Sequence, residues 1–460
     1  MKSQTAKTGV AIVSAFSLAC GYVMADAWDL VPGFFTLQTP ASAAAPYPTV
    51  ESSLLHNQEV PPLPQLQQNA PTPDKTKLAT ALAKLAQDPE MTGKVSAIVA
   101  DVATGEILAE MNPTRPVAPA SVNKLLTATA VLAAFDPDKT LQTETKYADG
   151  TVYLIGGGDV LLAADEGNPE AVIGRAGLGD LARKTATVLK DAGHNAVRLS
   201  LDTSLFAAEA FPSEAEAGIE DWVMEASPIA VDRNLNSAGE FIGAPKVQTL
   251  QIFAEQLRAA GIEVQATDEA RTPESAQDLA SVESAPVRDL VDLALRESDN
   301  TLAETLGHLV AVQRGEMADF AGASAAVLAQ LQDLGLNVDG VELADASGLS
   351  ESNQLTATLV GQILSRIGSC TDESCASLLS ALPVAKLDGT LAARFNQLDL
   401  GGKVRAKTGS LGSVTSMAGL LYTQAGRELS FVIIVDDVPN DGAYSLRPLI
   451  DATIAKIAAA

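Results

Sequence analysis

Two kinds of hydrophobic periodicity alternate along the chain. Apolar residues recur every three or four positions in residues 76–87 and 121–135, which predicts helices with one buried face. Residues 95–101 alternate between apolar and polar side chains, a turn follows at residues 103–105, and residues 106–110 return from it. This second pattern predicts two strands joined by a turn.

The same patterns continue nearer the C-terminus. Helical spacing returns in residues 287–295 and 301–312. Residues 404–411, 414–422 and 429–436 are rich in β-branched and apolar residues, and we interpret them as three strands.

The length and a shift in composition predict more than one domain. A chain of 460 residues is too long for a single hydrophobic core. Residues 141–283 hold a Gly156-Gly157-Gly158-Asp159 loop, several β-like runs and acidic loops. We interpret them as an inserted, mostly β module that interrupts one domain formed by residues 76–140 and 284–460.

The N-terminus has the composition of an export signal. Residues 1–25 combine a basic start with an apolar run, and Val23-Met24-Ala25 has small residues at both ends of a cleavage site. An uncleaved membrane anchor is the alternative, which would tether the protein to the membrane. Residues 26–75 are rich in Pro and Ala and are interpreted as a linker. The sequence therefore predicts an extracytoplasmic protein.

Charge and residue counts exclude several function classes. The net charge of −26, from 31 basic and 57 acidic residues, repels phosphate backbones, so no nucleic-acid partner is expected. The three cysteines form no zinc pattern, and no metal is expected. The three histidines are far apart in the sequence. A serine nucleophile in this chain is therefore expected to use a base other than histidine.

The first candidate motif is Ser121-Val122-Asn123-Lys124. Three residues are close to one helical turn, so Ser121 and Lys124 share a face. A serine hydroxyl needs a base, and lysine can serve if burial or a neighbouring cation lowers its pKa by about 3 units. Alone, the motif is weak evidence, and a chance pair on the surface is the favoured interpretation.

Two further short motifs follow in the sequence. Ser298-Asp299-Asn300 lies between two helical runs, where a hydroxyl and an amide at alternate positions can point into a cleft; a helix N-cap is the alternative. Lys407-Thr408-Gly409, followed by Ser410, lies on a predicted strand whose backbone can pair with an extended substrate. Lys7-Thr8-Gly9 repeats that triplet before the export segment, so one triplet alone is weak evidence.

Taken in this order, the three motifs resemble the signature of penicillin-recognising serine enzymes. The stretch from Asp345 to Ser350 resembles the DGSGLS segment of that family, with Ala346 in place of glycine. Residues 382–394 resemble its LPVAG…DGTL…R segment. The gap of 177 residues between Ser121 and Ser298 is similar to that of the class C low-molecular-mass penicillin-binding proteins.

The resemblance implies an α/β fold in which helices cover both faces of a sheet, the three-layer β-lactamase/transpeptidase-like domain, interrupted by the insert. It implies a serine D-alanyl-D-alanine carboxypeptidase that forms an acyl-enzyme on peptidoglycan stem peptides, is inhibited by β-lactam antibiotics and needs no cofactor. Endopeptidase activity is a further expectation. A β-lactamase or esterase with the same motifs, or a non-catalytic cell-wall-binding protein, are the alternatives.

The resemblance also implies a role for each motif residue. Ser121 attacks the carbonyl carbon and Lys124 takes its proton. Ser298 and Asn300 orient Lys124 and pass the proton to the leaving group. The substrate-binding residues implied are Lys407 and Thr408 for the terminal carboxylate, the Ser410 backbone N–H for the oxyanion, and Asp159 for an amine of the stem peptide. A structural turn is the alternative reading of the loop that contains Asp159.

Cys370 and Cys375 are five residues apart between two helical runs. Export would place them in an oxidising compartment, where a disulfide persists. The sequence therefore predicts a local disulfide, with two independent thiols as the alternative.

Overall fold

The computed structural model describes residues 70–460, except 214, 215, 217, 370 and 371. The predicted export segment, residues 1–25, and nearly all of the predicted linker lie outside the described residues. Within the described part of the chain, no helix combines the length and apolar character needed to cross a membrane.

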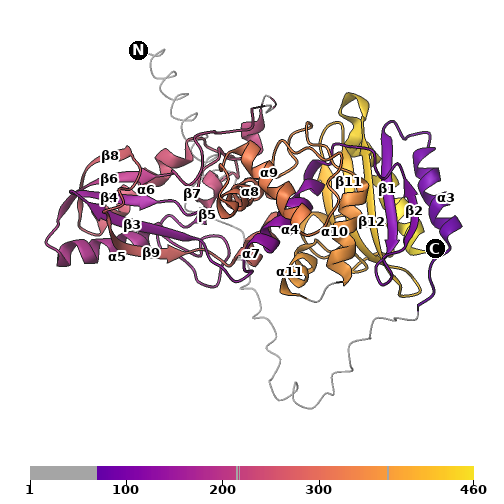
Figure 1. Cartoon of the computed structure of the whole chain (residues 1–460), viewed down its shortest axis with the longest axis horizontal. Coiled ribbons are helices and arrows are strands. Elements are labelled where there is room, and N and C mark those ends of the chain that lie inside the picture. Colours follow the sequence, from indigo (N-terminus) through magenta and orange to yellow (C-terminus); the bar gives the residue numbers. More distant parts are fainter. Residues whose placement is uncertain (1–69, 214–215, 217, 370–371) are drawn as a thin grey trace, which may run out of the picture. The chain divides into compact units, whose positions relative to one another are not determined.

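A five-stranded antiparallel sheet, drawn in Figure 1, joins the two ends of the described chain. Its order is β10-β11-β12-β1-β2. The strands are β1 (Lys94–Asp101), β2 (Ile107–Met111), β10 (Val404–Ser410), β11 (Thr415–Tyr422) and β12 (Glu428–Asp436). All four pairings are antiparallel, and β12 lies between β11 and β1. The five strands predicted from the sequence are all present.

Helices cover both faces of this sheet, as the alternation of buried residues requires. Phe431 and Ile433 of β12 pack in one core with α3 (Lys75–Ala86) and α12 (Arg447–Ala458). Val432, between them, packs in a second core on the opposite face. The predicted three-layer arrangement is therefore confirmed.

The second core is built from helices. It contains apolar residues of six helices and of the sheet face beneath them. These helices are α4 (Lys124–Ala134), α7 (Val287–Arg296), α8 (Asn300–Arg314), α9 (Phe320–Asp333), α10 (Ala357–Ser369) and α11 (Glu373–Ala381). The helices predicted over residues 287–295 and 301–312 correspond to α7 and α8. The predicted run 121–135 begins as a short 3₁₀ helix, η1 (Ala120–Asn123), before α4.

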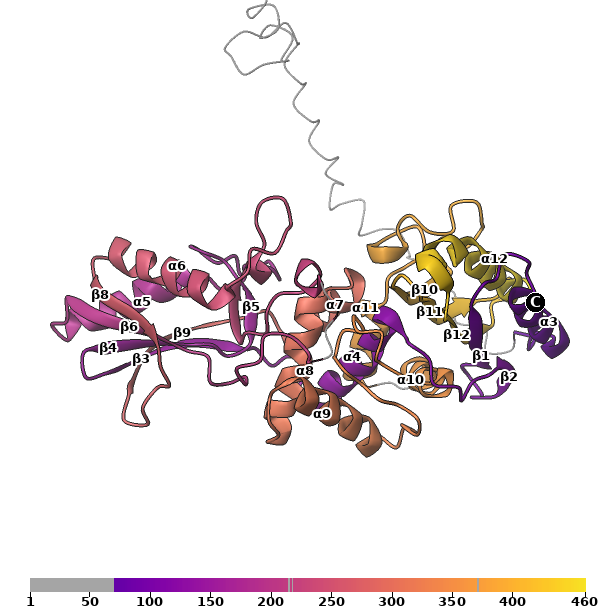
Figure 2. The same cartoon turned by 90° about the horizontal axis from the view of Figure 1, so that it is seen from above.

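Residues 141–283 build sheets of their own, seen on the left of Figure 2. The larger sheet has the order β8-β6-β4-β3-β9. Its strands are β3 (Gln142–Ala148), β4 (Thr151–Ile155), β6 (Ala196–Asp202), β8 (Glu263–Glu269) and β9 (Gln277–Glu283). A second sheet pairs β5 (Asp159–Leu162) with β7 (Ile229–Val231). Among the described residues, none of these strands pairs with the main sheet.

The insert, expected from the sequence to be mostly β, also contains two long helices that were not predicted. They are α5 (Leu178–Asp191) and α6 (Pro245–Ala259). Their apolar faces pack with β4, β6 and β8 in a third hydrophobic core. The segment between β6 and α6 holds two short 3₁₀ helices, η2 (Ile219–Asp221) and η3 (Asp232–Asn234).

Candidate active site

Ser121 and Lys124 lie at the junction of η1 and α4. The Lys124 Nζ atom is 3.1 Å from the Ser121 Oγ atom. In a 3₁₀ turn, side chains three residues apart eclipse one another, which brings the two groups together. The backbone enters this turn through Ala120 in the left-handed region, at φ 49°. Such a conformation is costly for alanine, and backbone strain of this kind is concentrated at functional sites.

Lys124 is buried among neutral oxygens. Its Nζ atom bonds the Asn300 Oδ1 atom at 2.6 Å and the Ser347 carbonyl oxygen at 2.8 Å. Burial lowers the pKa of Lys124 to about 8, although the carboxylates of Glu304 and Asp345 oppose this shift. A lysine with this pKa is partly neutral near pH 8 and can accept a proton from Ser121.

The Ser298-Asp299-Asn300 motif serves both as a helix cap and as part of the site. The Asp299 Oδ1 atom accepts the Leu302 backbone N–H at 2.9 Å, which caps α8. Asn300 holds Lys124, and the Ser298 Oγ atom accepts a hydrogen bond from Lys407 at 2.8 Å. The two alternatives drawn from the sequence are therefore satisfied by different residues of one triplet.

Lys407 is fully buried on β10. Besides Ser298, its Nζ atom bonds the Thr408 carbonyl oxygen at 2.7 Å. Burial, together with the charge of Lys124, holds the pKa of Lys407 well below its usual range. The Thr408 hydroxyl bonds the Thr390 hydroxyl at 2.9 Å. Both lysines are therefore buried, and they contact the site through hydrogen bonds to Ser121, Asn300 and Ser298.

Gly409 lets β10 lie directly against the Ser121 turn. A Cβ atom there would be 2.9 Å from the Ser121 amide nitrogen and 2.8 Å from the Pro119 carbonyl oxygen. Only glycine avoids both clashes.

A cavity of ≈ 370 Å³ opens above these groups. It is lined by Ser121, Ser298, Asn300 and Ser410, which lie outside residues 141–283. Ile219 and Trp222 of the insert line its other side. Lys124, Lys407 and Thr408 are not part of its lining.

Comparison with known proteins identifies the family of the chain. The sequence profile of the D-Ala-D-Ala carboxypeptidase 3 (S13) family matches residues 78–237 and 223–457. The chain belongs to this family. It is 32% identical over 397 residues to "Carboxypeptidase DacB" of Mycolicibacterium smegmatis, which covers 83% of this chain and 84% of that protein.

One more relative is similar to the chain, and one solved structure shares its fold. The chain is 26% identical over 452 residues to the D-alanyl-D-alanine carboxypeptidase of Actinomadura sp. (strain R39), covering 81% of this chain and 82% of that protein. Penicillin binding protein 4 (dacB) from Haemophilus influenzae superposes with a TM-score of 0.68 at 20% identity, covering 85% of this chain and 100% of that one. The resemblance to class C low-molecular-mass penicillin-binding proteins is thus confirmed, as is a serine-type D-Ala-D-Ala carboxypeptidase.

Asp159 neither lines the cavity nor has a hydrogen bond to another residue expected at the site. It begins β5 and is 3% exposed. Its Oδ1 atom accepts the Leu161 backbone N–H at 2.9 Å. Burial raises the pKa of the Asp159 carboxyl to about 6. Its role in binding a substrate amine stays a prediction.

Glu304 is a residue that sequence reasoning missed. Its two carboxylate oxygens accept the backbone N–H groups of Ala346 at 3.0 Å and of Ser347 at 2.8 Å. These bonds hold the loop whose Ser347 carbonyl bonds Lys124. Burial raises the pKa of Glu304, and the neighbouring Asp345 carboxylate adds to the shift. Glu304 lies one helical turn after Asn300, so helix periodicity could have indicated it.

Three other residues near the site had no sequence signal. Arg447, which begins α12, donates to the Ser410 Oγ atom at 2.7 Å. Trp222 and Arg233, both in the insert, bond Asn300 and Asp299 respectively. No motif or spacing connects any of them to Ser121.

Two remaining expectations concern other chemistry. Cys375 is disulfide-bonded, but Cys370 lies outside the described residues, so their pairing stays a prediction. Across the described ranges, no cluster of three or more His, Cys, Asp or Glu side chains could hold a metal ion.

Proposed function

We propose that this carboxypeptidase is exported and removes the terminal D-alanine from peptidoglycan stem peptides through an acyl-enzyme on Ser121. The observation that carries the proposal is the 3.1 Å contact between the Ser121 Oγ atom and Lys124, a lysine whose pKa burial lowers to about 8. A neutral lysine at this distance can take the hydroxyl proton as the oxygen attacks the carbonyl carbon.

Acylation then breaks the bond between the two D-alanines. Asn300 keeps Lys124 aligned on Ser121 through its Oδ1 atom. We assign the oxyanion to the backbone N–H groups of Ser121 and Ser410, a stabilisation typically of about 3 kcal/mol. The Ser298 hydroxyl, which is held by Lys407, relays to the departing amine the proton that Lys124 took from Ser121. Water attacks the ester afterwards and regenerates the free serine.

The terminal carboxylate is assigned to the β10 end of the cavity. Ser410 lines the cavity there, and Arg447 donates to its hydroxyl. Lys407 is too deeply buried to line the cavity, so we assign it an electrostatic role through Ser298. The positive charge of Arg447 beside Ser410 favours a substrate that ends in a free carboxylate.

Inhibition by penicillins and endopeptidase activity belong to the same proposal. The Haemophilus protein that shares this fold has been solved with a β-lactam bound. A β-lactam ring presents an amide carbonyl to the same nucleophile, and the ester it forms is expected to hydrolyse slowly. We also assign to this enzyme an extracytoplasmic location, which its substrate requires, with the N-terminal segment as an export signal or membrane tether.

The experiment measures D-alanine released from a stem pentapeptide that ends in D-Ala-D-Ala. We expect release by the wild type and none by Ser121→Ala. Ser237→Ala, which removes an exposed hydroxyl in the insert, is the matched control and should be fully active. Release by the Ser121 variant, or none by the wild type, would refute the proposal.

The lifetime of a penicillin adduct separates this proposal from its alternatives. An adduct on Ser121 that persists for hours supports a carboxypeptidase. Turnover within seconds would indicate a β-lactamase, and no adduct at all would indicate a wall-binding protein without activity.

A further inference from the structure

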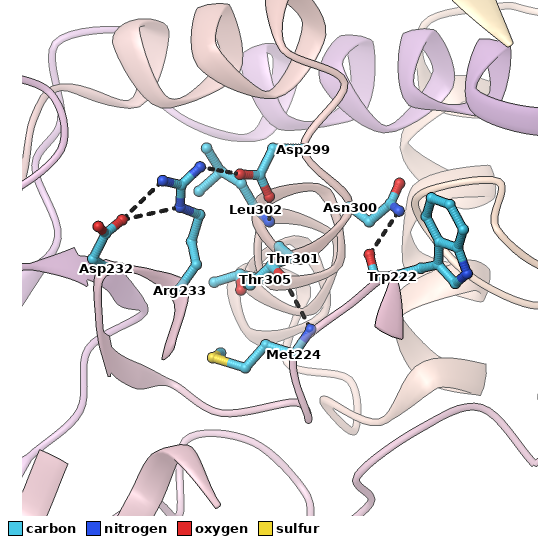
Figure 3. Close-up of polar contacts among 9 residues, drawn as sticks. All are labelled: Trp222, Met224, Asp232, Arg233, Asp299, Asn300, Thr301, Leu302 and Thr305. Atoms are coloured by element: carbon cyan, nitrogen blue, oxygen red, sulfur yellow. Dashed lines mark hydrogen bonds and ion pairs between the residues drawn. The ribbon is translucent and has the colours of Figure 1, made fainter. Parts of the chain in front are cut away.

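The first residues of α8 are bonded to the insert, as Figure 3 shows. The Asn300 Nδ2 atom donates to the Trp222 carbonyl oxygen at 2.9 Å. One residue further, the Thr301 hydroxyl accepts the Met224 backbone N–H at 3.0 Å. The chain segment of the insert that lines the cavity is thus attached to the residue that holds Lys124.

An ion pair adds a third attachment, on the preceding residue. Arg233 donates from one guanidinium nitrogen to the Asp299 Oδ2 atom at 3.0 Å, and from another to the Asp232 Oδ1 atom at 2.8 Å (Figure 3). The Asp299 side chain is only 8% exposed and that of Arg233 19%. Asp299, Asn300 and Thr301 are therefore each held by a different residue of segment 222–233, which we call the brace.

The backbone that carries Arg233 is strained. Asp232, Arg233 and Asn234 are three consecutive residues in the left-handed region, with φ values of 38°, 55° and 57°. Each such residue costs on the order of 1 kcal/mol unless its surroundings compensate. The Asn234 side chain bonds the Gly243 carbonyl oxygen at 2.8 Å, which helps to hold this turn. This strained turn positions the Arg233 guanidinium group to donate to the Asp299 carboxylate.

The brace determines which way the Asn300 amide faces. Its nitrogen donates to the Trp222 carbonyl, so its oxygen must face Lys124, where it accepts a bond at 2.6 Å. A flipped amide would place a donor against the Lys124 ammonium group and leave the Trp222 carbonyl without its donor. The second N–H of the amide is left for a substrate carbonyl.

The charges around Lys124 come from several elements. Glu304 of α8, Asp345 of the following loop and Asp299 of the α8 cap supply carboxyl groups, and Lys407 of β10 supplies an amine whose own pKa is held low. The three carboxylates favour the protonated form of Lys124 and thus oppose its use as a base. Of these three, Asp299 is the one that a guanidinium group neutralises directly.

We propose that the insert is part of the catalytic machinery: Arg233, through Asp299, holds Asn300 against Lys124 and balances the negative charge beside it. The proposal rests on the acyl-enzyme function assigned above. Arg233 is a positioning residue, because it contacts neither Ser121 nor the cavity. Without Arg233, no guanidinium group neutralises the Asp299 carboxylate. The pKa of Lys124 then rises, and acylation requires a higher pH.

The test is the pH dependence of penicillin acylation in four full-length variants. The acidic limb is the pH range in which the acylation rate rises toward its plateau. Arg233→Gln should shift the midpoint of this limb upward by about half a pH unit or more. Asp299→Asn, which retains a good helix cap, should move the limb downward. The double variant should return close to the wild-type limb, because both charges are absent. Arg233→Lys keeps the charge and should restore the limb but not the full rate.

The matched control is Arg198→Gln, which removes an exposed arginine paired with Asp268 on the insert sheet. It should leave the profile unchanged. A thermal unfolding midpoint close to that of the wild type would show that Arg233→Gln is folded, so that a lower plateau at high pH reports a misplaced Asn300. An acidic limb that stays in place in both single variants, or a loss of rate equal at every pH, would overturn the proposal.

Failure of the underlying function gives a different result. A wild-type protein that forms no penicillin adduct would refute the acyl-enzyme. The pKa of Lys124 is then read by NMR of selectively labelled lysine in the same variants. The same order of shifts would support the charge balance, and identical values would overturn it.

Discussion

The buried cations of this protein differ according to where they lie. Away from the cavity, three arginines that are buried or half-buried bind carboxylates with two bonds each. These pairs are Arg427 with Asp101, Arg115 with Asp436, and Arg394 with Asp451. At the cavity, Lys124 and Lys407 contact only hydroxyl, amide and carbonyl oxygens.

The difference separates stability from reactivity. A buried charge that is paired and hydrogen-bonded stays charged and holds segments together. A buried lysine among neutral oxygens gives up its proton more readily, which costs stability but creates a base. The carboxyl groups of Glu304 and Asp345 do not bond Lys124 directly, because they accept backbone N–H groups of the neighbouring loop.

The largest expected effect is on the rate of acylation. Lys124→Ala should lower the second-order rate of penicillin acylation about a thousandfold, because the general base is lost. Lys124→Arg should be equally inactive, since a guanidinium group stays protonated. Stopped-flow fluorescence with a labelled penicillin measures both. An arginine variant that retains most of the rate would show that the cation, and not the base, is what matters.

The paired arginines should show the opposite behaviour. Arg394→Met leaves the largely buried Asp451 without its partner and should lower the free energy of unfolding by about 2–3 kcal/mol. Lys75→Met, at an exposed ion pair with Glu106, should change it by less than about 0.5 kcal/mol. Urea unfolding measures both variants. Equal losses would remove the distinction between buried and exposed pairs.

Lys407 tests whether buried charge selects the substrate. Lys407→Ala should weaken turnover of peptides that end in a free carboxylate about tenfold more than cleavage of internal cross-links, because the amine that holds Ser298 at the carboxylate end of the cavity is lost. Lys403→Ala, at the exposed start of the same strand region, is the control. If both substrate types lose activity equally, Lys407 does not serve carboxylate recognition.

The smallest effect has an unusual sign. The pKa of Lys124 falls from 10.5 to about 8 on folding, so the protonated lysine destabilises the fold at lower pH. Lys124→Met should therefore raise the free energy of unfolding by about 1 kcal/mol at pH 7, after the loss of its hydrogen bonds is counted. The gain should shrink as the pH rises from 8 to 10.5. A gain that is independent of pH would indicate packing instead of charge.

The sequence predicted the parts of the site that lie close together in the chain or repeat a known motif. Ser121 and Lys124 were given by helical spacing, and Ser298, Asn300 and Lys407 by the order of the motifs. Arg447 and Arg233 were not predictable, because each meets its partner only after distant segments fold together. For Asp299 the sequence indicated only a possible helix N-cap, because its ion pair depends on Arg233 in the insert.

The insert shows the same limit on a larger scale. Residues 178–191 carry apolar side chains at helical spacing, so α5 was predictable from the sequence. The attachment of Trp222 and Met224 to α8 was not, because both bonds involve backbone atoms that any residue provides.

The pH dependence of acylation at Ser121 tests the central claim most directly. With penicillin in excess, and the adduct located on Ser121 by mass spectrometry, the rate should rise about tenfold per pH unit and level off near pH 8, where Lys124 loses its proton. A rate that stays flat from pH 6 to pH 10, or an adduct on another residue, would contradict a neutral Lys124 as the base for Ser121.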